Sequence, residues 1–277
     1  MVWSVRLLDT GIGSASYNMA LDEAILMQVS EGFSPPTLRF YRWDKPTISL
    51  GYFQRTKREI DLEALARKQF SLVRRMTGGR AVLHDKELTY SIIVPGDHEL
   101  ARASVVESYR MVSMGLQEGF QQLGLQAQVV SLADESMRDK FRSLGSAACF
   151  DSPSWYELVV EGRKIAGSAQ VRAHGGLLQH GSLLLDLCAD DLFDVLVFRS
   201  EDHRDLLRKE FDSRAVSVNQ LSSQDVSYEE AAEAFRNGME LGLPCKLIPE
   251  EETAKEKEIA IQLQKEKYEA DEWNFRR

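Results

Sequence analysis

Hydrophobic residues recur along this chain with strand-like alternation in some segments and with helical spacing in others. Residues 3–8 have the pattern of a strand, and residues 9–13, which include two glycines, predict a turn. Leu21, Ile25 and Val29 then recur at four-residue intervals, which predicts a helix, and Gly32 is expected to end it. Strand-like runs follow at 37–42 and 47–52.

Capping boxes, each a Ser or Thr followed three residues later by Glu, indicate where further helices begin. They are Thr56 with Glu59, Ser104 with Glu107, and Ser227 with Glu230. The first predicts a helix that runs to about Gln69, and the second predicts a long amphipathic helix that Gly124 ends. Most of the chain after residue 189 is expected to be helical, including the charged stretch 250–268.

Short strands are predicted between these helices, and three of them follow one another closely. They cover 155–160, 164–172 and 177–187. Glu161-Gly162 and His174-Gly175-Gly176 are expected to be the turns of this antiparallel meander. Other strands are expected at 71–75, 88–94 and 126–131. Because strands and helices are mixed without a regular βαβ repeat, the pattern predicts an α+β fold with a mixed, largely antiparallel sheet and flanking helices.

The composition allows a sizeable core and gives no sign of a basic surface. Of the 277 residues 43 % are hydrophobic, and the formal net charge is −9, which argues against nucleic acid or an anionic membrane as the main partner. No signal peptide and no membrane span are expected, so we expect a cytoplasmic protein. Cys149, Cys188 and Cys245 are too sparse for a disulfide framework or a zinc site, and no metal is expected.

A glycine-containing stretch at the end of the 71–75 strand is the first candidate binding site. It consists of Arg74-Arg75-Met76-Thr77-Gly78-Gly79-Arg80. Glycines at a strand end let the backbone approach a ligand closely, and the paired arginines could hold an anion. A tight turn with solvated arginines is the alternative. The stretch is not a Walker loop, because the Gly-Lys-Ser/Thr ending is missing.

Cys149 is the candidate nucleophile, because it follows a polar loop at 134–146 and precedes a strand. A thiol in such a place can be exposed and activated by a nearby cation, although a free cysteine is more often a small buried hydrophobe. Cys188 and Cys245 are expected to be structural.

Lys164 and two histidines are further candidates. Lys164 could point its ammonium group into a site floored by Gly167 and Ser168, or it could be an exposed hairpin lysine. The neighbours His84-Asp85 could orient a polar group, and His180 lies on the third strand of the meander.

Four motifs occur in the order found in lipoate–protein ligases and octanoyltransferases. They are Arg74-Arg75-x-Thr77-Gly78-Gly79-Arg80-Ala81-Val82-x-His84-Asp85, Leu88-Thr89-Tyr90-Ser91, Lys164-Ile165-Ala166-Gly167-Ser168-Ala169-Gln170, and His180-Gly181-Ser182-Leu183-Leu184. With these motifs the chain resembles that family from its N-terminal helix to about Asp186. The run from Cys149 to Leu158 is similar to the octanoyltransferase branch, which has a cysteine before this strand. Ligases of the family instead activate lipoate with ATP and need no cysteine.

The resemblance implies a catalytic domain of the biotinyl/lipoyl-protein ligase type. We expect it to span 1–245, with 246–277 as a helical extension packed on the same domain. The implied reaction moves an octanoyl group from octanoyl-acyl carrier protein, through a thioester on Cys149, to a lysine of a lipoyl-domain protein, without a cofactor. The acceptor would be the glycine-cleavage H protein or a dehydrogenase E2.

The same resemblance implies a set of site residues. Cys149 and Lys164 would be catalytic, with Lys164 favouring the thiolate and polarising the thioester carbonyl. The implied substrate-binding residues are Arg75, Thr77, Gly78, Gly79, His84, Gly167, Ser168, Ala169, His180 and Gly181.

Other functions stay open at this point. An ATP-dependent lipoate ligase would release pyrophosphate and would work without Cys149. An amidotransferase that moves octanoyl between two lipoyl-domain proteins would share the acyl-enzyme and differ in its donor. A non-catalytic protein that recognises lipoyl domains would form no acyl adduct, and a cysteine hydrolase would need an acyl-enzyme open to water.

Overall fold

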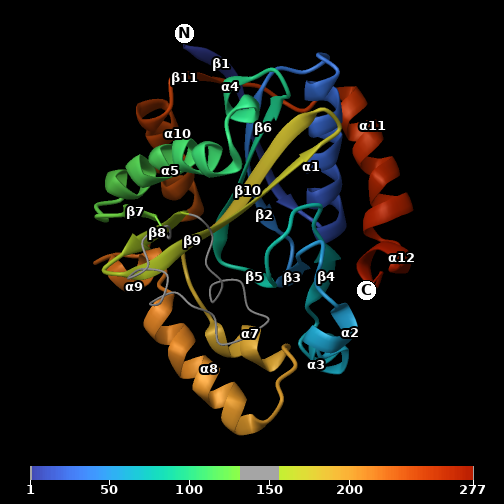
Figure 1. Cartoon of the computed structure of the whole chain (residues 1–277), viewed down its shortest axis with the longest axis vertical. Coiled ribbons are helices and arrows are strands. Elements are labelled where there is room, and N and C mark those ends of the chain that lie inside the picture. The colour runs from blue at the N-terminus through green and yellow to red at the C-terminus, as the bar shows by residue number, and fades with distance from the viewer. Residues whose placement is uncertain (1, 132–155, 277) are drawn as a thin grey trace.

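A mixed sheet of eight strands is the centre of the protein, shown in Figure 1 as a computed structural model that describes residues 2–131 and 156–276. The strand order is β11-β1-β2-β6-β10-β9-β8-β7. The strands are β1 (Trp3–Gly13), β2 (Thr37–Trp43), β6 (Glu87–Pro95), β7 (Gln128–Ser131), β8 (Tyr156–Val160), β9 (Arg163–Ala173), β10 (Gly176–Leu184) and β11 (Cys245–Pro249). β1 is parallel to β2 and β11, and the other neighbouring pairs are antiparallel, which confirms the predicted fold class.

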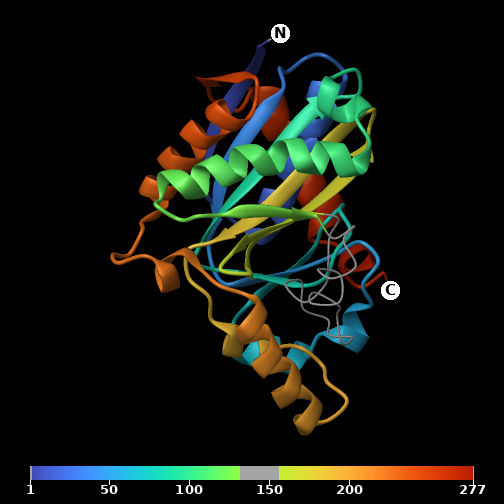
Figure 2. The same ribbon diagram turned by 60° about the vertical axis from the view of Figure 1, so that its left-hand side comes forward.

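Helices cover both faces of this sheet (Figures 1 and 2). On one face lie α5 (Val105–Gln122) and α10 (Tyr228–Gly242), and on the other lie α1 (Ala15–Ser30) and α11 (Ala254–Leu263). The alternation of β2 explains this division, since Leu38 and Phe40 belong to the first core and Tyr41 and Trp43 to the second. The remaining short helices of the upper part are α4 (Glu99–Arg102) and α9 (Val218–Leu221).

A smaller sheet of three strands lies below the large one in Figure 1 and has its own apolar core. Its order is β4-β3-β5, from β3 (Thr47–Leu50), β4 (Ser71–Arg74) and β5 (Val82–His84). In the described part of the chain four helices pack around it: α2 (Thr56–Glu59), α3 (Leu62–Arg67), α7 (Ala189–Asp194) and α8 (Glu201–Arg214). The glycine loop, residues 75–81, connects β4 to β5 within this sheet, and the chain passes between the two sheets from β2 to β3 and from β5 to β6.

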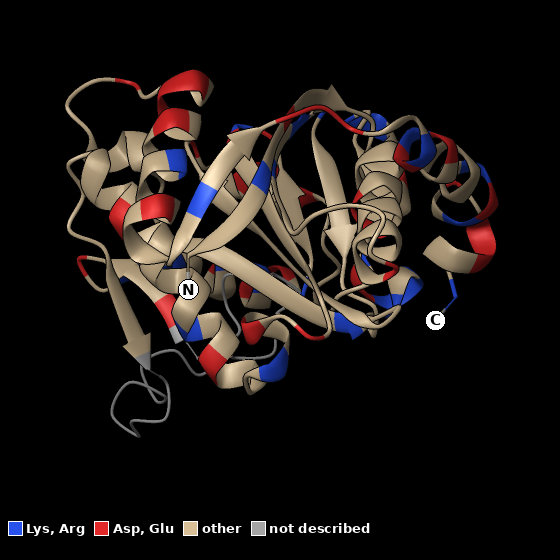
Figure 3. Ribbon diagram, turned by 90° about the horizontal axis from the view of Figure 1, so that it is seen from above, with Lys and Arg blue, Asp and Glu red and all other residues tan. Residues whose placement is uncertain are grey.

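The C-terminal segment packs against α1 and β1. After α11 it continues as a π-helical turn, η2 (Gln264–Tyr268), and ends in α12 (Asp271–Asn274). Figure 3 shows residues of both charges along this segment, and two of them pair with buried residues of β1 and α1. Glu256 pairs with Arg6 at 2.6 Å, and Lys267 pairs with Glu23 at 2.7 Å. The expected division of the chain at residue 245 stays a prediction.

The meander and most helices agree with the sequence pattern, and the meander turns have the expected left-handed backbone. Both Glu161 and Gly162 have positive φ, at 51° and 74°, and His174 and Gly175 likewise, at 52° and 81°. The hydroxyls of Ser104 and Ser227 accept hydrogen bonds from the backbone of Glu107 and Glu230, as their capping boxes predict.

Several expectations about local structure were wrong. Residues 9–13 do not form a turn, because β1 continues to Gly13 through an irregularity between Asp9 and Ile12, where Gly11 has φ +63°. The helix expected from Thr56 to Gln69 is divided into α2 and α3 by extended backbone at Ile60. The Thr56 hydroxyl does not cap α2, because it donates to the carbonyl of Asn274 at 2.7 Å. The pattern predicts neither β5 nor β11.

Candidate functional site

One row of residues across four neighbouring strands forms the floor of a cavity. Tyr41 on β2 pairs with Thr89 on β6, Thr89 pairs with Ser182 on β10, and Ser182 pairs with Gly167 on β9. All four line the cavity. The register therefore explains why motifs far apart in the sequence meet here, since each contributes a strand position to the same row.

The cavity is narrow, with about 400 Å³ of empty space and a largely apolar lining. Met19, Tyr41, Trp43 and Val82 supply apolar walls. The expected site residues that line it are Arg75, Gly79, His84, Gly167, Ser168, Ala169, His180 and Gly181. A side chain at Gly181 would collide with its surroundings, because a Cβ atom would lie 2.6 Å from the carbonyl oxygen of Gly167.

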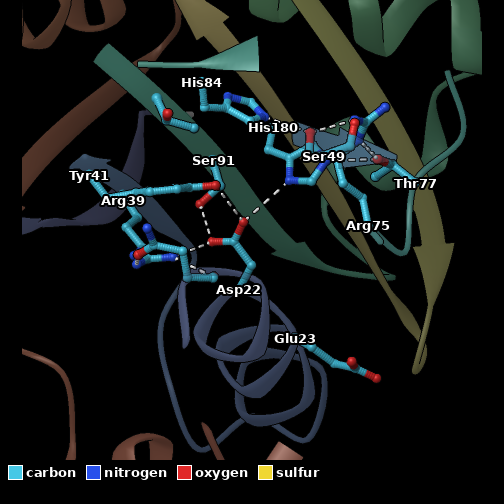
Figure 4. Close-up of polar contacts among 12 residues, drawn as sticks. Asp22, Glu23, Arg39, Tyr41, Ser49, Arg75, Thr77, His84, Ser91 and His180 are labelled. Carbon is cyan, nitrogen blue, oxygen red and sulfur yellow. Dashed lines mark hydrogen bonds and ion pairs between the residues drawn. The ribbon is translucent and has the colours of Figure 1, made fainter. Parts of the chain in front are cut away.

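His180 connects the sheet to the glycine loop (Figure 4). Its Nε2 atom lies 2.7 Å from the Thr77 hydroxyl, and its Nδ1 atom lies 3.3 Å from an oxygen of Asp22. Burial lowers the pKa of His180, and the carboxylate of Asp22 offsets only part of this effect. The ring is therefore neutral near pH 7, donates from Nδ1 to Asp22 and accepts the Thr77 hydrogen at Nε2.

Asp22, on α1, accepts hydrogen bonds from three more side chains of the sheet beneath it (Figure 4). Arg39 donates at 2.8 Å, Ser91 at 2.9 Å and Tyr41 at 3.1 Å. Burial alone would raise the pKa of the Asp22 carboxyl, but the charge of Arg39 and the bond from His180 hold it below its usual range. Asp22 is thus a buried carboxylate with its lone pairs satisfied, and it fixes the orientation of His180.

A second series of a carboxylate, an imidazole and a hydroxyl contains His84. Its Nδ1 atom lies 2.7 Å from Glu87 and its Nε2 atom 2.6 Å from the Ser49 hydroxyl, and its ring stacks on Trp43 with centroids 4.2 Å apart. Glu87 also accepts short hydrogen bonds from Thr89 and Ser182 of the cavity floor. The partner of His84 is therefore Glu87, three residues further on, and not the adjacent aspartate that the sequence suggested.

Arg75 contacts the last hydroxyl of both hydrogen-bonded series, that of Ser49 and that of Thr77. Its Nη1 donates to the Ser49 hydroxyl at 2.6 Å, and its Nε lies 3.4 Å from the Thr77 hydroxyl. Its Nη2 donates to the carbonyls of Gly78 and Arg80, each at 3.0 Å. Hence Arg75 is buried and holds the loop backbone, so it is not a solvated arginine.

Arg74 has a purely structural set of contacts. Its guanidinium is fully buried and donates to the carbonyls of Gly51, Gln54 and Asn274. Its backbone N–H donates to the Asn274 side chain at 2.8 Å. The C-terminal segment thus fixes the position of Arg74, the residue that precedes Arg75.

Two backbone amide groups of the glycine loop, those of Gly78 and Gly79, point away from the donors that hold the loop carbonyls. The Thr77 carbonyl accepts from Tyr52, and the Gly78 carbonyl accepts from Arg75. In a trans peptide the next N–H points opposite to the carbonyl, so the amides of Gly78 and Gly79 point away from these donors. Within residues 2–131 and 156–276 neither amide meets an acceptor. Such a pair can bind an anionic oxygen.

Lys164 lies on the same strand as Gly167 and Ser168 but is not among the residues that line the cavity. It is buried, and its Nζ pairs with Glu157 on the neighbouring strand β8 at 2.8 Å. It is therefore not an exposed hairpin lysine.

The two described cysteines both disfavour the thiolate form. Burial raises the pKa of Cys245 to about 11, and Cys245 is part of the core, as expected. Cys188 is exposed, and partial burial together with the nearby Asp191 raises its pKa as well. Cys149 lies outside the described residues.

The sequence motifs did not point to four residues that contact His180 or His84: Asp22, Ser49, Trp43 and Glu87. Glu87 had a recognisable pattern, because a carboxylate begins the apolar strand β6 two residues before Thr89, on the same face. Asp22 had none, because it lies near the middle of α1 and belongs to none of the sequence motifs.

Neither a metal site nor a membrane span is evident in the described part of the chain. Among these residues no three His, Cys, Asp or Glu side chains are grouped so that they could hold a metal ion. No helix among them has the length and apolar character needed to cross a bilayer.

The sheet, the glycine loop and the narrow, largely apolar cavity together are the features to compare with proteins of known function. Residues 14–240 match the model of the lipoyl protein ligase A/B catalytic domain. An octanoyltransferase LipM from Brevibacillus brevis is 52 % identical over 98 % of this chain and 99 % of its own length. An octanoyltransferase LipM from Geobacillus kaustophilus is 52 % identical over 100 % of this chain and 99 % of its own length.

A solved structure agrees with this match. The bipartite lipoate–protein ligase of Thermoplasma acidophilum superposes with a TM-score of 0.82 at 27 % identity, over 99 % of this chain and 96 % of its own. The chain belongs to the lipoyl protein ligase A/B family, in its octanoyltransferase branch, and is an acyltransferase.

Proposed function

We propose that this enzyme takes an octanoyl group from octanoyl-acyl carrier protein onto Cys149 and passes it to a specific lysine of a lipoyl-domain protein. The cavity is the observation that carries this proposal, because four strands floor it and the glycine loop borders it. The names of the relatives, octanoyltransferases of nearly equal length at 52 % identity, support the acyl group.

In the first half-reaction the Cys149 thiolate attacks the carbonyl carbon of the donor thioester. The carbonyl oxygen becomes an oxyanion, and the bond to the carrier sulfur then breaks, so that the carrier leaves as a thiolate and is protonated by solvent. One thioester replaces another, so the exchange is nearly isoenergetic and needs neither ATP nor another cofactor. The raised pKa values of Cys188 and Cys245 support Cys149 as the nucleophile.

Lys164 is proposed to favour the thiolate. A free thiol has a pKa of about 8.5 and is only partly ionised at neutral pH, and a nearby ammonium group stabilises the charged form. The ion pair with Glu157 supports this role, because it holds a buried cation on β9, three residues from Gly167 of the cavity floor. Glu157 would then orient the ammonium group without contacting the substrate.

The cavity and the glycine loop divide the binding of the acyl group between them. Met19, Trp43 and Val82 would surround the alkyl chain, and each buried methylene contributes about 0.8 kcal/mol. The amides of Gly78 and Gly79 would donate to the oxyanion, whose charge is fully developed only in the tetrahedral state.

In the second half-reaction the neutral amine of the acceptor lysine attacks the acyl-enzyme. An amide bond forms, the Cys149 thiolate is released, and the excess proton leaves to solvent. We propose the glycine-cleavage H protein or a dehydrogenase E2 as acceptor, in the cytoplasm. The structurally similar ligase of Thermoplasma acidophilum is described together with its E2 lipoyl domain, which supports a lipoyl domain as the acceptor class.

The test supplies a lipoyl domain with one octanoyl source at a time and measures its mass. We expect octanoylation from octanoyl-acyl carrier protein without ATP, and none from free octanoate with ATP and magnesium. Transfer from an octanoylated H protein alone would instead make the enzyme an amidotransferase. Transfer that requires ATP would make it a ligase.

A further inference from the structure

An open groove lies beside the glycine loop, outside the cavity. The end of α2 and the segment before α8 form its two sides, joined where the Val197 N–H donates to the Glu59 carbonyl at 3.0 Å. The groove has about 1040 Å³ of empty space. Its lining includes Arg58, Arg80, Val197, Phe198, Arg199 and Leu207.

The three arginines make this groove positive in a protein whose net charge is −9. In the described part of the chain Arg58, Arg80 and Arg199 form no ion pair, whereas Arg204 next to the groove pairs with Asp194 at 2.5 Å. Among the described residues that line the groove Glu59 is the only acid, and it already accepts hydrogen bonds from Gln54 and from the backbone of Arg55. A negative partner would therefore meet three cations whose charge is not compensated locally.

The groove and the cavity are consecutive along the chain. Gly79 lines the cavity, and Arg80, the next residue, lines the groove. A donor bound in the groove would therefore lie against the same loop that borders the cavity.

We propose that this groove is the docking surface for the protein that donates the acyl group, and that it binds an acidic patch on that donor. This inference rests on the proposed function and adds the place where the donor binds. Apolar Val197, Phe198 and Leu207 supply contact area between the charges, as in transient interfaces where charge guides encounter and apolar contacts hold.

Charge favours the donor over the acceptor. The acceptor has to bring a lysine, and the three groove arginines, which form no ion pair within the described residues, would repel its ammonium group. The donor brings an uncharged acyl thioester on an arm that carries a phosphodiester, and arginine binds phosphate well. The groove therefore matches the donor in both its protein surface and its arm.

The experiment compares a protein donor with a small donor in one double variant. Arg58→Glu/Arg199→Glu reverses two exposed cations of the groove. Arg236→Glu/Lys246→Glu is the matched control, with the same change of charge on exposed residues of α10 and β11. Acyl-enzyme formation is measured from octanoyl-acyl carrier protein and from S-octanoyl-N-acetylcysteamine, which lacks both protein and phosphate.

We expect the groove variant to lose at least about tenfold in kcat/KM for the carrier protein, with the small donor within about twofold of wild type. The control variant should keep both rates. For wild type, added salt should slow only the reaction with the carrier protein.

Two results would overturn the docking proposal and leave the proposed function intact. One is an unchanged kcat/KM for the carrier protein in the groove variant. The other is a selective rise in KM for the lipoyl-domain acceptor, which would assign the groove to the acceptor. A wild-type enzyme that forms no acyl-enzyme from either donor would remove the proposed function and the docking proposal together.

Discussion

The Nε2 atom of His180 lies 2.7 Å from the hydroxyl oxygen of Thr77, which ties the central strand β10 to the glycine loop. The bond joins residues 103 positions apart. On its other side the ring meets Asp22, so a carboxylate, an imidazole and a hydroxyl lie in series. This series and a second one, Glu87, His84 and Ser49, both contact Arg75. Arg75 in turn holds the carbonyls of the glycine loop.

Thr77→Val should detach the loop from His180. The valine keeps the shape of threonine but leaves Nε2 of His180 without its donor, and an unsatisfied buried polar group costs about 1–3 kcal/mol. We expect the free energy of unfolding to fall by that amount and kcat/KM to fall at least about tenfold. Thr77→Ser, which keeps the hydroxyl, should restore most of both. Equal activity of the valine variant and wild type would mean that this bond does not position the loop.

The stability of the protein should fall as the pH drops below about 6.5. Burial lowers the pKa of His180 from 6.5, so the unfolded chain binds more protons than the folded one between the folded pKa and 6.5. Stability is therefore complete above pH 6.5 and decreases as the pH falls toward the folded pKa. Urea unfolding at several pH values should show this decrease. In His180→Gln the free energy of unfolding should change less steeply with pH.

A residual slope is expected in that variant, because burial also lowers the pKa of His98. A pH dependence between 5 and 7 identical to that of wild type would contradict the neutral, buried state of His180.

Lys164→Ala should slow acyl-enzyme formation by about 100-fold or more, because the variant loses the cation proposed to stabilise the thiolate. The change also removes the partner 2.8 Å from Glu157, so unfolding must be measured alongside. Lys164→Arg keeps the charge and the ion pair. If the arginine variant is stable and still slow, position of the charge matters as well as its presence. A normal rate for Lys164→Ala would exclude Lys164 from the site.

Glu256→Ala should destabilise the attachment of the C-terminal segment. Glu256 and Arg6 are fully buried and lie 2.6 Å apart, and removing one partner of a buried pair typically costs 3–5 kcal/mol. We expect a loss of about that size in the free energy of unfolding. Lys255→Ala, at an exposed neighbouring position, should change it by less than about 0.5 kcal/mol. Similar results for the two variants would show that the pair does not anchor the segment.

Local patterns in the sequence predicted what depends on neighbours along the chain. Helix α5 follows from the spacing of its apolar residues and from Ser104, and the meander follows from turns that need positive φ. The three-residue strand β5 and the strand β11 were not predictable in this way, because each is stabilised by partners distant in sequence. Thr56 was misjudged for the same reason, since its hydroxyl binds Asn274.

Among the site residues, too, those within local motifs could be predicted from the sequence and the others could not. The glycine loop, His84 and His180 have recognisable motifs, and the structure brings them to one cavity. Asp22 acts on His180 across 158 positions and has no pattern around it. The arginine pair shows the limit of composition, because guanidinium groups expected to face an anion or water donate to backbone carbonyls instead.

The central claim is that Cys149 holds the acyl group between donor and acceptor, and intact-mass analysis tests it most directly. The wild-type enzyme mixed with octanoyl-acyl carrier protein, without acceptor or ATP, should gain the mass of one octanoyl group. That mass should disappear when a lipoyl domain is added, and Cys149→Ala, folded as judged by its unfolding curve, should never acquire it. A Cys149→Ala variant that carries the octanoyl mass, or that still octanoylates a lipoyl domain, would contradict the account.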